Sequence, residues 1–129
     1  MPSQYKPANY NTASPYLIVN GAAGTIAFLQ QVFGAVELRR FADDSGKIMH
    51  AELRLDDTVI MLADPALPEW PPVAGFVHVY VPDVEVTYRQ ALAAGAKSVQ
   101  EPVKKEDEDK RGGVQDAGGT TWWIATKVE

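Results

Sequence analysis

The sequence predicts an α+β fold built from two copies of one β-α-β-β-β module. Two stretches about sixty residues apart share a short β-branched strand, a turn, one amphipathic helix of about three turns, and a glycine where the helix must end. They start at Tyr16 and Phe76 and end at Gly34 and Gly95. Because such a unit cannot bury its apolar side alone, the repeat predicts a pseudo-symmetric pair packed around a shared surface. A functional site is therefore expected between the two halves.

The first module is predicted over residues 14–64. A strand at 15–20 precedes a helix at 22–33 that places Ala22, Ile26, Leu29 and Phe33 on one face. Further strands are expected at 36–41, 47–55 and 58–63, separated by turns at 43–46 and 56–57. Residues 65–74 contain four prolines. Since proline is excluded from central strands, this segment is predicted to connect the modules.

The second module is predicted over residues 75–127. It has a strand at 75–81, a helix at 84–94 that Asp83 caps, and strands at 97–103, 113–116 and 120–127, the last two joined by a Gly118-Gly119 turn. Residues 104–111 mix charges of both signs and predict a solvated loop. Residues 1–13 carry two prolines and a single lysine and are expected to form a flexible N-terminal arm.

Composition excludes several classes of protein. With 129 residues, 46% hydrophobic and 22% charged, the chain suits one soluble domain with a real core. A net charge of −5 and a pI near 5.0 argue against a nucleic-acid partner, which requires a basic surface. The lack of cysteine removes disulfides, thiol nucleophiles and thiolate ligands, and the cytoplasm is the expected compartment. No apolar run near the N-terminus resembles a signal peptide or a membrane span, so no membrane partner is expected.

Strand alternation predicts a polar row on residues 48–55. Successive side chains of a strand point to opposite faces, so one face of this strand is apolar and is expected to meet the helix. The opposite, inward-facing side carries His50, Glu52 and Arg54. The apolar face consists of Met49, Ala51, Leu53 and Leu55. The same rule separates Trp122 from Trp123, and we expect Trp122 in the core and Trp123 facing the site.

Several short motifs occur in order along both modules. They are Ser14-Pro-Tyr-Leu-Ile-Val19, the helix end at Phe33-Gly34, Met49-His-Ala-Glu-Leu53, Val59-Ile-Met-Leu-Ala-Asp64, Arg111-Gly-Gly-Val114 and Trp122-Trp-Ile-Ala-Thr126. Their order and spacing resemble the vicinal oxygen chelate superfamily, more closely its PhnB-like branch of glyoxalase and bleomycin-resistance proteins. The resemblance covers residues 14–129 as one domain. It implies a curved, cup-shaped mixed sheet with helices on the convex side, commonly in a homodimer, without implying one reaction.

Metal-dependent members of this superfamily bind a divalent ion through four side chains on inner strands. The resemblance places those positions at Ser14, Met61, Phe76 and Trp123. None of these side chains is a good ligand for a hard cation, which prefers carboxylate or imidazole. A site without metal or other cofactor is therefore expected.

Aromatic walls with a few convergent polar groups predict a pocket for a planar or conjugated organic molecule. Arg111, beside two glycines, is a candidate clamp for an anionic group, or alternatively forms an ion pair with the neighbouring acids. His50 and Glu52 have the alternative of a hydrogen-bonded structural pair. The predicted ligand-binding residues are Tyr16, His50, Glu52, Met61, Phe76, His78, Tyr80, Arg111 and Trp123.

The leading functional hypothesis is a homodimeric, metal-independent protein that binds a small molecule, of the sequestration or resistance type. An alternative is a metal-dependent lyase, isomerase or dioxygenase in which His50, Glu52 and His78 hold the ion, because side chains two apart on a strand face the same way. A structural or regulatory module without a ligand is the third possibility.

Overall fold

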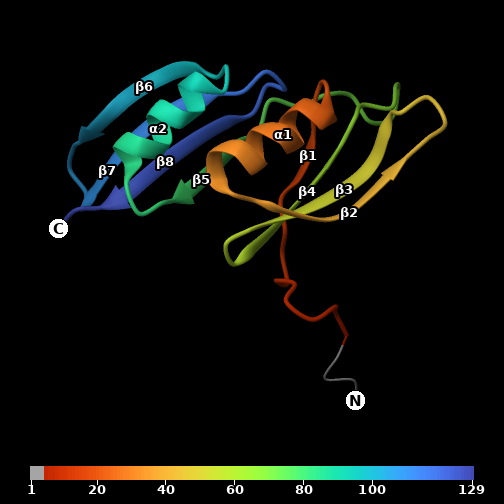
Figure 1. Cartoon of the computed structure of the whole chain (residues 1–129), viewed down its shortest axis with the longest axis horizontal. Helices are drawn as coiled ribbons and strands as arrows, with labels where there is room; N and C mark the ends of the chain where they lie inside the picture. Colours follow the sequence, from red (N-terminus) through yellow and green to blue (C-terminus); the bar gives the residue numbers. More distant parts are fainter. Residues whose placement is uncertain (1–4) are drawn as a thin grey trace.

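The computed structural model describes residues 5–129 and contains two β-α-β-β-β modules side by side (Figure 1). The predicted α+β class and module order are confirmed. The elements, in chain order, are β1 (Tyr16–Ile18), α1 (Ala22–Phe33), β2 (Val36–Ala42), β3 (Ile48–Leu55), β4 (Thr58–Ala63), β5 (Phe76–Tyr80), α2 (Val84–Ala93), β6 (Lys97–Lys104), β7 (Asp109–Gln115) and β8 (Thr121–Lys127). Within the described residues neither helix is long and apolar enough to cross a membrane.

Each module forms its own four-stranded sheet. The strand orders are β1-β4-β3-β2 and β5-β8-β7-β6, with the first and last strands of each module parallel and the other pairs antiparallel. In the two parallel pairs, Tyr16 lies opposite Met61 and His78 lies opposite Trp123. These two pairs occupy equivalent positions in the repeat.

Helix α1 packs against both modules. Its buried face includes Ile26 and Leu29, and it contacts β2, β3 and α2. The rings of Phe28 and Phe33 lie 6.5 and 5.5 Å from that of Trp122 in β8. Core side chains therefore fill most of the space between the halves.

Two grooves border both modules. One of about 260 Å³ lies at the β3–β4 turn and β5, where His78 and Tyr80 line it, and one of about 380 Å³ lies between the end of α1 and the segment that leads from β5 into α2, where Tyr80 lines it. The other predicted site residues line neither groove.

Trp122 is held by a buried carboxylate. Asp116 accepts hydrogen bonds from the backbone N–H of Gly118 and Thr120 and, at 2.8 Å, from the indole Nε1 of Trp122. The indole is fully buried and Asp116 is 6% exposed. One side chain thus shapes the turn before β8 and satisfies the polar atom of the largest core residue.

Trp123 lies on the opposite face of β8, as predicted. Its ring covers Gly113, where an added Cβ would lie 2.6 Å from the ring. Gly113 is thus required by this close contact rather than by backbone conformation. The strand register assumed for β8 is confirmed.

The two helices are capped in different ways. Asp83 caps α2 as predicted, accepting from the N–H groups of Glu85 and Val86. Helix α1 begins after Gly21 and has no cap of its own. Asp64, at the end of β4, instead accepts from Ala22 N at 2.7 Å and from Ile48 N at 2.8 Å. This carboxylate joins α1, β3 and β4 at one end of the first sheet.

The predicted alternation of β3 is wrong at its start. Ile48 occupies the core position, and Met49 is 62% exposed. The register passes from the pair Phe41–His50 to the pair Ala42–Ile48, which leaves Met49 without a partner. This bulge releases Met49 from the apolar face that the sequence pattern assigned to it.

The predicted solvated loop at 104–111 is also wrong over half of its length. Strand β6 continues to Lys104 and β7 starts at Asp109, so only residues 105–108 connect them. Asp109 is 4% exposed because Tyr80 and Arg111 both donate to its carboxylate. These contacts compensate the charges of Asp109 and Arg111. This part of the segment therefore forms a strand, although its charged composition predicts a loop.

Part of the expected N-terminal arm is bound to the first sheet. Tyr10 donates its hydroxyl hydrogen to Glu52, and the side-chain oxygen of Asn11 accepts from Val59 N at 2.9 Å. The first four residues of the arm lie outside the described part of the chain.

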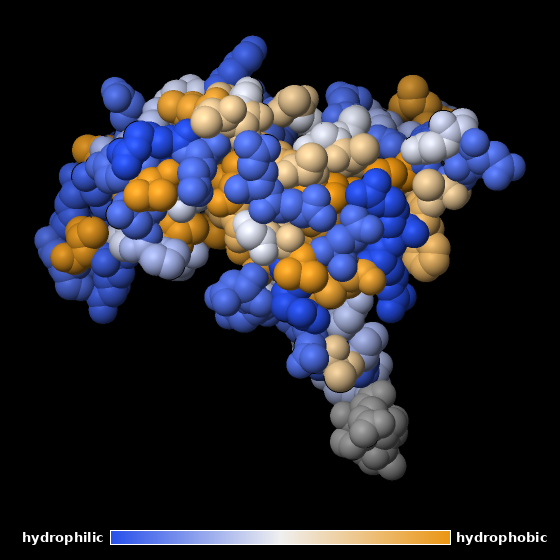
Figure 2. Space-filling model, in the orientation of Figure 1, coloured by the Kyte–Doolittle hydropathy of each residue, from blue (hydrophilic) through white to orange (hydrophobic). Residues whose placement is uncertain are grey.

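On the side seen in Figure 1, hydrophobic residues are interrupted by hydrophilic ones (Figure 2).

We predict that the two neighbouring tryptophans differ in their effect on stability. Trp122→Ala should lower the free energy of unfolding by roughly 3 to 5 kcal/mol, because it empties a fully buried site and leaves Asp116 without a partner. Trp123→Ala, on the face of β8 that points away from the core, should lower the free energy of unfolding by clearly less. Guanidinium unfolding followed by circular dichroism measures both, and equal losses would contradict this assignment of faces.

Candidate functional site

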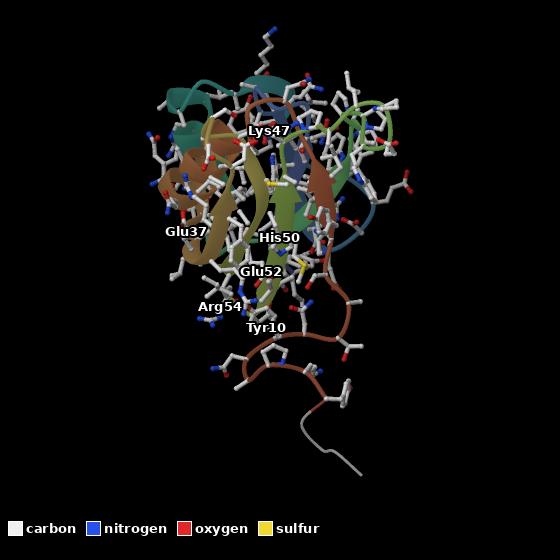
Figure 3. All side chains as sticks on the ribbon, turned by 90° about the vertical axis from the view of Figure 1, so that its right-hand side faces the viewer. Tyr10, Glu37, Lys47, His50, Glu52 and Arg54 are labelled. Carbon is white, nitrogen blue, oxygen red and sulfur yellow. The ribbon has the colours of Figure 1, made fainter. Side chains whose placement is uncertain are left out.

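A buried carboxylate organises the face of the first sheet that points away from helix α1. We call the face of each sheet that points away from the core its outer face. Glu52 is only 5% exposed. It accepts from the Tyr10 hydroxyl, lies 2.7 Å from His50 Nε2, and pairs with Arg39 Nε at 3.2 Å. Figure 3 looks onto this face, where Tyr10, His50 and Glu52 lie together on the end of the molecule away from the second module.

These partners keep Glu52 ionised. Burial alone would raise the pKa of Glu52, but the hydrogen bonds from Tyr10 and His50 and the charge of Arg39 outweigh burial and hold that pKa below its ordinary value. The bond to the carboxylate in turn raises the pKa of the Tyr10 hydroxyl. Glu52 therefore acts only as an acceptor at neutral pH.

His50 connects this carboxylate to Tyr16. The hydroxyl of Tyr16 lies 2.9 Å from His50 Nδ1. Because ionised Glu52 can only accept, His50 Nε2 carries the proton of the neutral imidazole, and Nδ1 accepts from Tyr16. Burial and the charge of Glu52 raise the pKa of Tyr16, so its hydroxyl remains protonated. A directed hydrogen-bond relay runs from Tyr16 through His50 to Glu52.

The relay borders an apolar pocket of about 470 Å³. Tyr16 is 49% exposed, Met49 62% and Trp70 61%, so large side chains stand open to the pocket. The pocket is formed by β1, the start of β3, the end of β4 and the connector. Its lining is completed by Ile18, Asp43, Lys47, Ala63, Asp64 and Ala66.

The outer face of the second sheet holds a different network. Arg111 donates to His78 Nε2 at 3.0 Å and to the carboxylates of Asp107 and Asp109 at 3.0 and 2.9 Å. Tyr80 donates to Asp109 at 2.7 Å. Burial and the neighbouring guanidinium lower the pKa of His78, which is therefore neutral and carries its proton on Nδ1. Arg111 is engaged in ion pairs with nearby acids, as its alternative interpretation predicted.

The predicted ligand-binding residues thus fall into two groups on separate sheets. No hydrogen bond or ion pair between them occurs in residues 5–129. The first group contains Tyr16, His50, Glu52 and Met61, and the second contains Phe76, His78, Tyr80, Arg111 and Trp123.

Sequence reasoning missed Tyr10, Arg39 and Trp70. Arg39 lies directly opposite Glu52 in the β2–β3 pair, so a correct strand register would have found it. Tyr10 reaches Glu52 from outside the predicted domain, and Trp70 belongs to a proline-rich connector. Neither has a local sequence signal that points to the site.

The residues present do not fit the divalent ion of the metal-dependent relatives. The set at Ser14, Met61, Phe76 and Trp123 offers neither a carboxylate nor an imidazole. The side chains directly opposite Met61 and Trp123 are Tyr16 and His78, which would replace Ser14 and Phe76 if the first-strand positions were moved by two residues. That shifted set supplies one imidazole and no carboxylate. The alternative set of His50, Glu52 and His78 is not brought together either, since the described residues contain no cluster of three His, Cys, Asp or Glu able to hold an ion.

We predict opposite tautomers for the two histidines of the chain. At a pH where both imidazoles are neutral, His50 should carry its proton on Nε2 and His78 on Nδ1, because one donates to Glu52 and the other accepts from Arg111. Long-range ¹⁵N–¹H correlation spectra of the side chains distinguish the two forms. The same tautomer for both histidines would contradict the hydrogen-bond directions assigned above.

A second prediction concerns the pH dependence of stability. Since the folded-state pKa of Glu52 lies below the ordinary value of 4.5, its contribution is fully present above that value and is lost as the pH falls through the folded-state pKa. Glu52→Gln should therefore flatten the loss of stability between about pH 5 and pH 3. Urea unfolding at several pH values measures the slope, and an unchanged slope would contradict the ionised state.

Comparison with known proteins identifies the family of this chain. The sequence profile of the Glyoxalase/Bleomycin resistance protein/Dioxygenase superfamily matches residues 11–124. Uncharacterised proteins of Mycobacterium bovis and Mycobacterium tuberculosis are each 34% identical over 127 residues, covering 89% of this chain and 82% and 74% of the respective relatives.

Solved structures show the same fold. TioX from Micromonospora superposes with a TM-score of 0.74 at 24% identity, covering 89% of this chain and 98% of TioX. The fosfomycin resistance protein FosX from Listeria monocytogenes gives a TM-score of 0.69 at 16% identity, covering 90% and 89%. At these identities the likeness concerns the fold alone, and the PhnB-like branch is not distinguished. On the profile match and the mycobacterial relatives, the chain belongs to the glyoxalase/bleomycin resistance/dioxygenase superfamily.

Proposed function

We propose that this protein binds a small aromatic or conjugated organic molecule on the outer face of its first sheet, without a metal ion. The observation that carries the proposal is the apolar pocket of about 470 Å³ with Tyr16, Met49 and Trp70 exposed around it. Exposed large apolar side chains around a concave surface, with a few oriented polar groups, are typical of small-molecule sites. The relay that ends at Tyr16 supplies such a polar group.

One cationic side chain at this pocket, Lys47, is available to an anionic group of a ligand, because the two carboxylates in the lining, Asp43 and Asp64, already accept hydrogen bonds from backbone N–H groups. Asp43 is occupied within its own turn, where it accepts from Ser45 and from the N–H of Lys47. The hydrogen bond from the Ser45 side chain leads the contacts that lower the pKa of Asp43. The ammonium group of Lys47 forms no ion pair with another described residue. A planar aromatic acid can place its ring against Trp70 and its carboxylate near Lys47.

The biological role that we propose is sequestration or resistance. Its support is family membership together with the structural neighbour FosX, which is a fosfomycin resistance protein. The expected compartment remains the cytoplasm, a proposal that rests on the sequence alone.

We also propose that two copies associate. Aromatic side chains on the outer faces are open to water, with Tyr16 at 49%, Phe41 at 55%, Phe76 at 73% and Tyr80 at 64% exposure. Soluble proteins tend to cover such groups, and a two-fold pair is the commonest way to do so. Light scattering at micromolar concentration should give the dimer mass, and a monomer that persists on concentration would contradict this proposal.

Binding is tested with a panel of planar aromatic carboxylates, from benzoate to phenylpyruvate, by isothermal titration calorimetry. At least one member should bind, and Trp70→Ala should weaken that binding by about tenfold or more, because an aromatic wall is lost. Val73→Ala is the matched control, since Val73 is exposed in the same connector and does not line the pocket.

Two results would refute the proposed site. If no aromatic molecule in the panel binds, the pocket is not a site for this class of ligand. If Trp70→Ala binds as tightly as the unaltered protein, the ligand lies elsewhere.

A further inference from the structure

We propose that Tyr16 is a catalytic acid–base residue, and that the protein catalyses metal-free proton transfer on an enolisable aromatic 2-oxo acid. The inference rests on the proposed function, because it assigns a reaction to the same pocket. His50 and Glu52 act through Tyr16 and are positioning residues.

The geometry of Tyr16 carries the inference. Its ring lines the apolar pocket, and its hydroxyl contacts His50 Nδ1 at 2.9 Å. Of the three relay residues, only Tyr16 lines this pocket. It is therefore the member of the relay that a ligand in the pocket would meet.

The other members of the relay are fixed from several sides. The His50 ring lies between the rings of Tyr16 and Phe41, with centroids 5.4 and 6.3 Å away. Glu52 is buried and also contacts Tyr10 and Arg39. A carboxylate held against an imidazole sets its tautomer and stabilises the imidazolium that forms when a proton arrives. The relay is thus prepared to accept a proton through Tyr16.

The proposed reaction is a keto–enol tautomerisation in which no co-reactant is consumed. The Tyr16 oxygen takes a proton from the carbon next to the carbonyl group, while the hydroxyl proton of Tyr16 passes to His50 Nδ1. The electron pair of the broken C–H bond forms the C=C bond, and the carbonyl π electrons move to oxygen. The enolate oxygen then takes a proton back through the reverse relay, which restores neutral His50 and protonated Tyr16.

The pocket also indicates the class of substrate. An aromatic ring suits the apolar walls at Met49 and Trp70, and a carboxylate suits Lys47. A 2-oxo acid adds a carbonyl group with acidic neighbouring hydrogens, which a proton relay can remove. Arylpyruvates combine these three features, and phenylpyruvate is the simplest probe.

The experiment follows deuterium incorporation into the methylene group of phenylpyruvate in D₂O by proton NMR, against a buffer blank. The unaltered protein should accelerate exchange. Tyr16→Phe should still bind phenylpyruvate by calorimetry but lose about 100-fold or more of the protein-catalysed rate. Tyr88→Phe, which removes a hydroxyl bonded to Ser98 beneath helix α2, is the matched control and should keep that rate.

The positioning role of His50 and Glu52 needs a separate measurement. His50→Gln and Glu52→Gln should lower kcat with little change in KM, and His50→Gln should also remove one limb of the pH–rate profile. A merely structural role would change stability, which unfolding experiments monitor, without changing the shape of the pH profile.

Each outcome bears on a different claim. If phenylpyruvate binds but exchanges no faster than in buffer, or if Tyr16→Phe exchanges as fast as the unaltered protein, the relay is overturned and the binding function stands. If other aromatic acids bind but phenylpyruvate does not, the assignment of a 2-oxo acid is wrong. If no aromatic acid binds, the proposed function fails and the reaction with it.

Discussion

The burial of Trp122 against helix α1 determines where this protein can have a site. The indole is fully buried, touches Phe28 and Phe33, and gives its N–H to the carboxylate of Asp116. This contact joins β8 of the second module to the helix of the first. The inner faces of both sheets are thereby used for the core, and the polar rows of β3 and β5 must lie on the outer faces.

A second constraint is the buried charge of Glu52. An isolated carboxylate in the interior is costly unless it is paired and hydrogen-bonded. Here Tyr10, Arg39 and His50 provide those partners from an N-terminal segment, from β2 and from β3 itself. The result is a polar group whose position and protonation are set before any ligand arrives, which is what a preorganised site requires. In the second sheet Asp109 has a related role, with Arg111 and Tyr80 as its partners.

Local pattern was sufficient to predict most of the fold. The bounds of α1 and of β4 agree with the prediction, and Asp83 caps α2, because helix periodicity, a following glycine and a capping side chain are signals within a few residues of sequence. The features that were missed depend on contacts between distant residues. The bulge at Met49 is set by pairing with β2, and the early start of β7 depends on Tyr80.

The candidate site also combines features that local sequence pattern predicts with features that depend on contacts between distant residues. Alternation correctly placed His50 and Glu52 on one face, and the resulting relay to Tyr16 joins residues that the sequence had grouped. Alternation within a strand carries no information on how two sheets are oriented, so the separation of the second group at His78 and Arg111 was not predictable. The pocket wall at Trp70 depends on the path of the connector, which has no periodic pattern.

We propose that a ligand occupies the outer face of the first sheet and not the space between the modules. The three tryptophans report on this question, because Trp70 lines the pocket, Trp122 lies in the core, and Trp123 lies on the second sheet. Titration of ¹⁵N-labelled protein with phenylpyruvate should shift the indole signal of Trp70 and leave that of Trp122 unchanged. A shift of the Trp122 signal with Trp70 unaffected would place the ligand between the modules and contradict the proposed site.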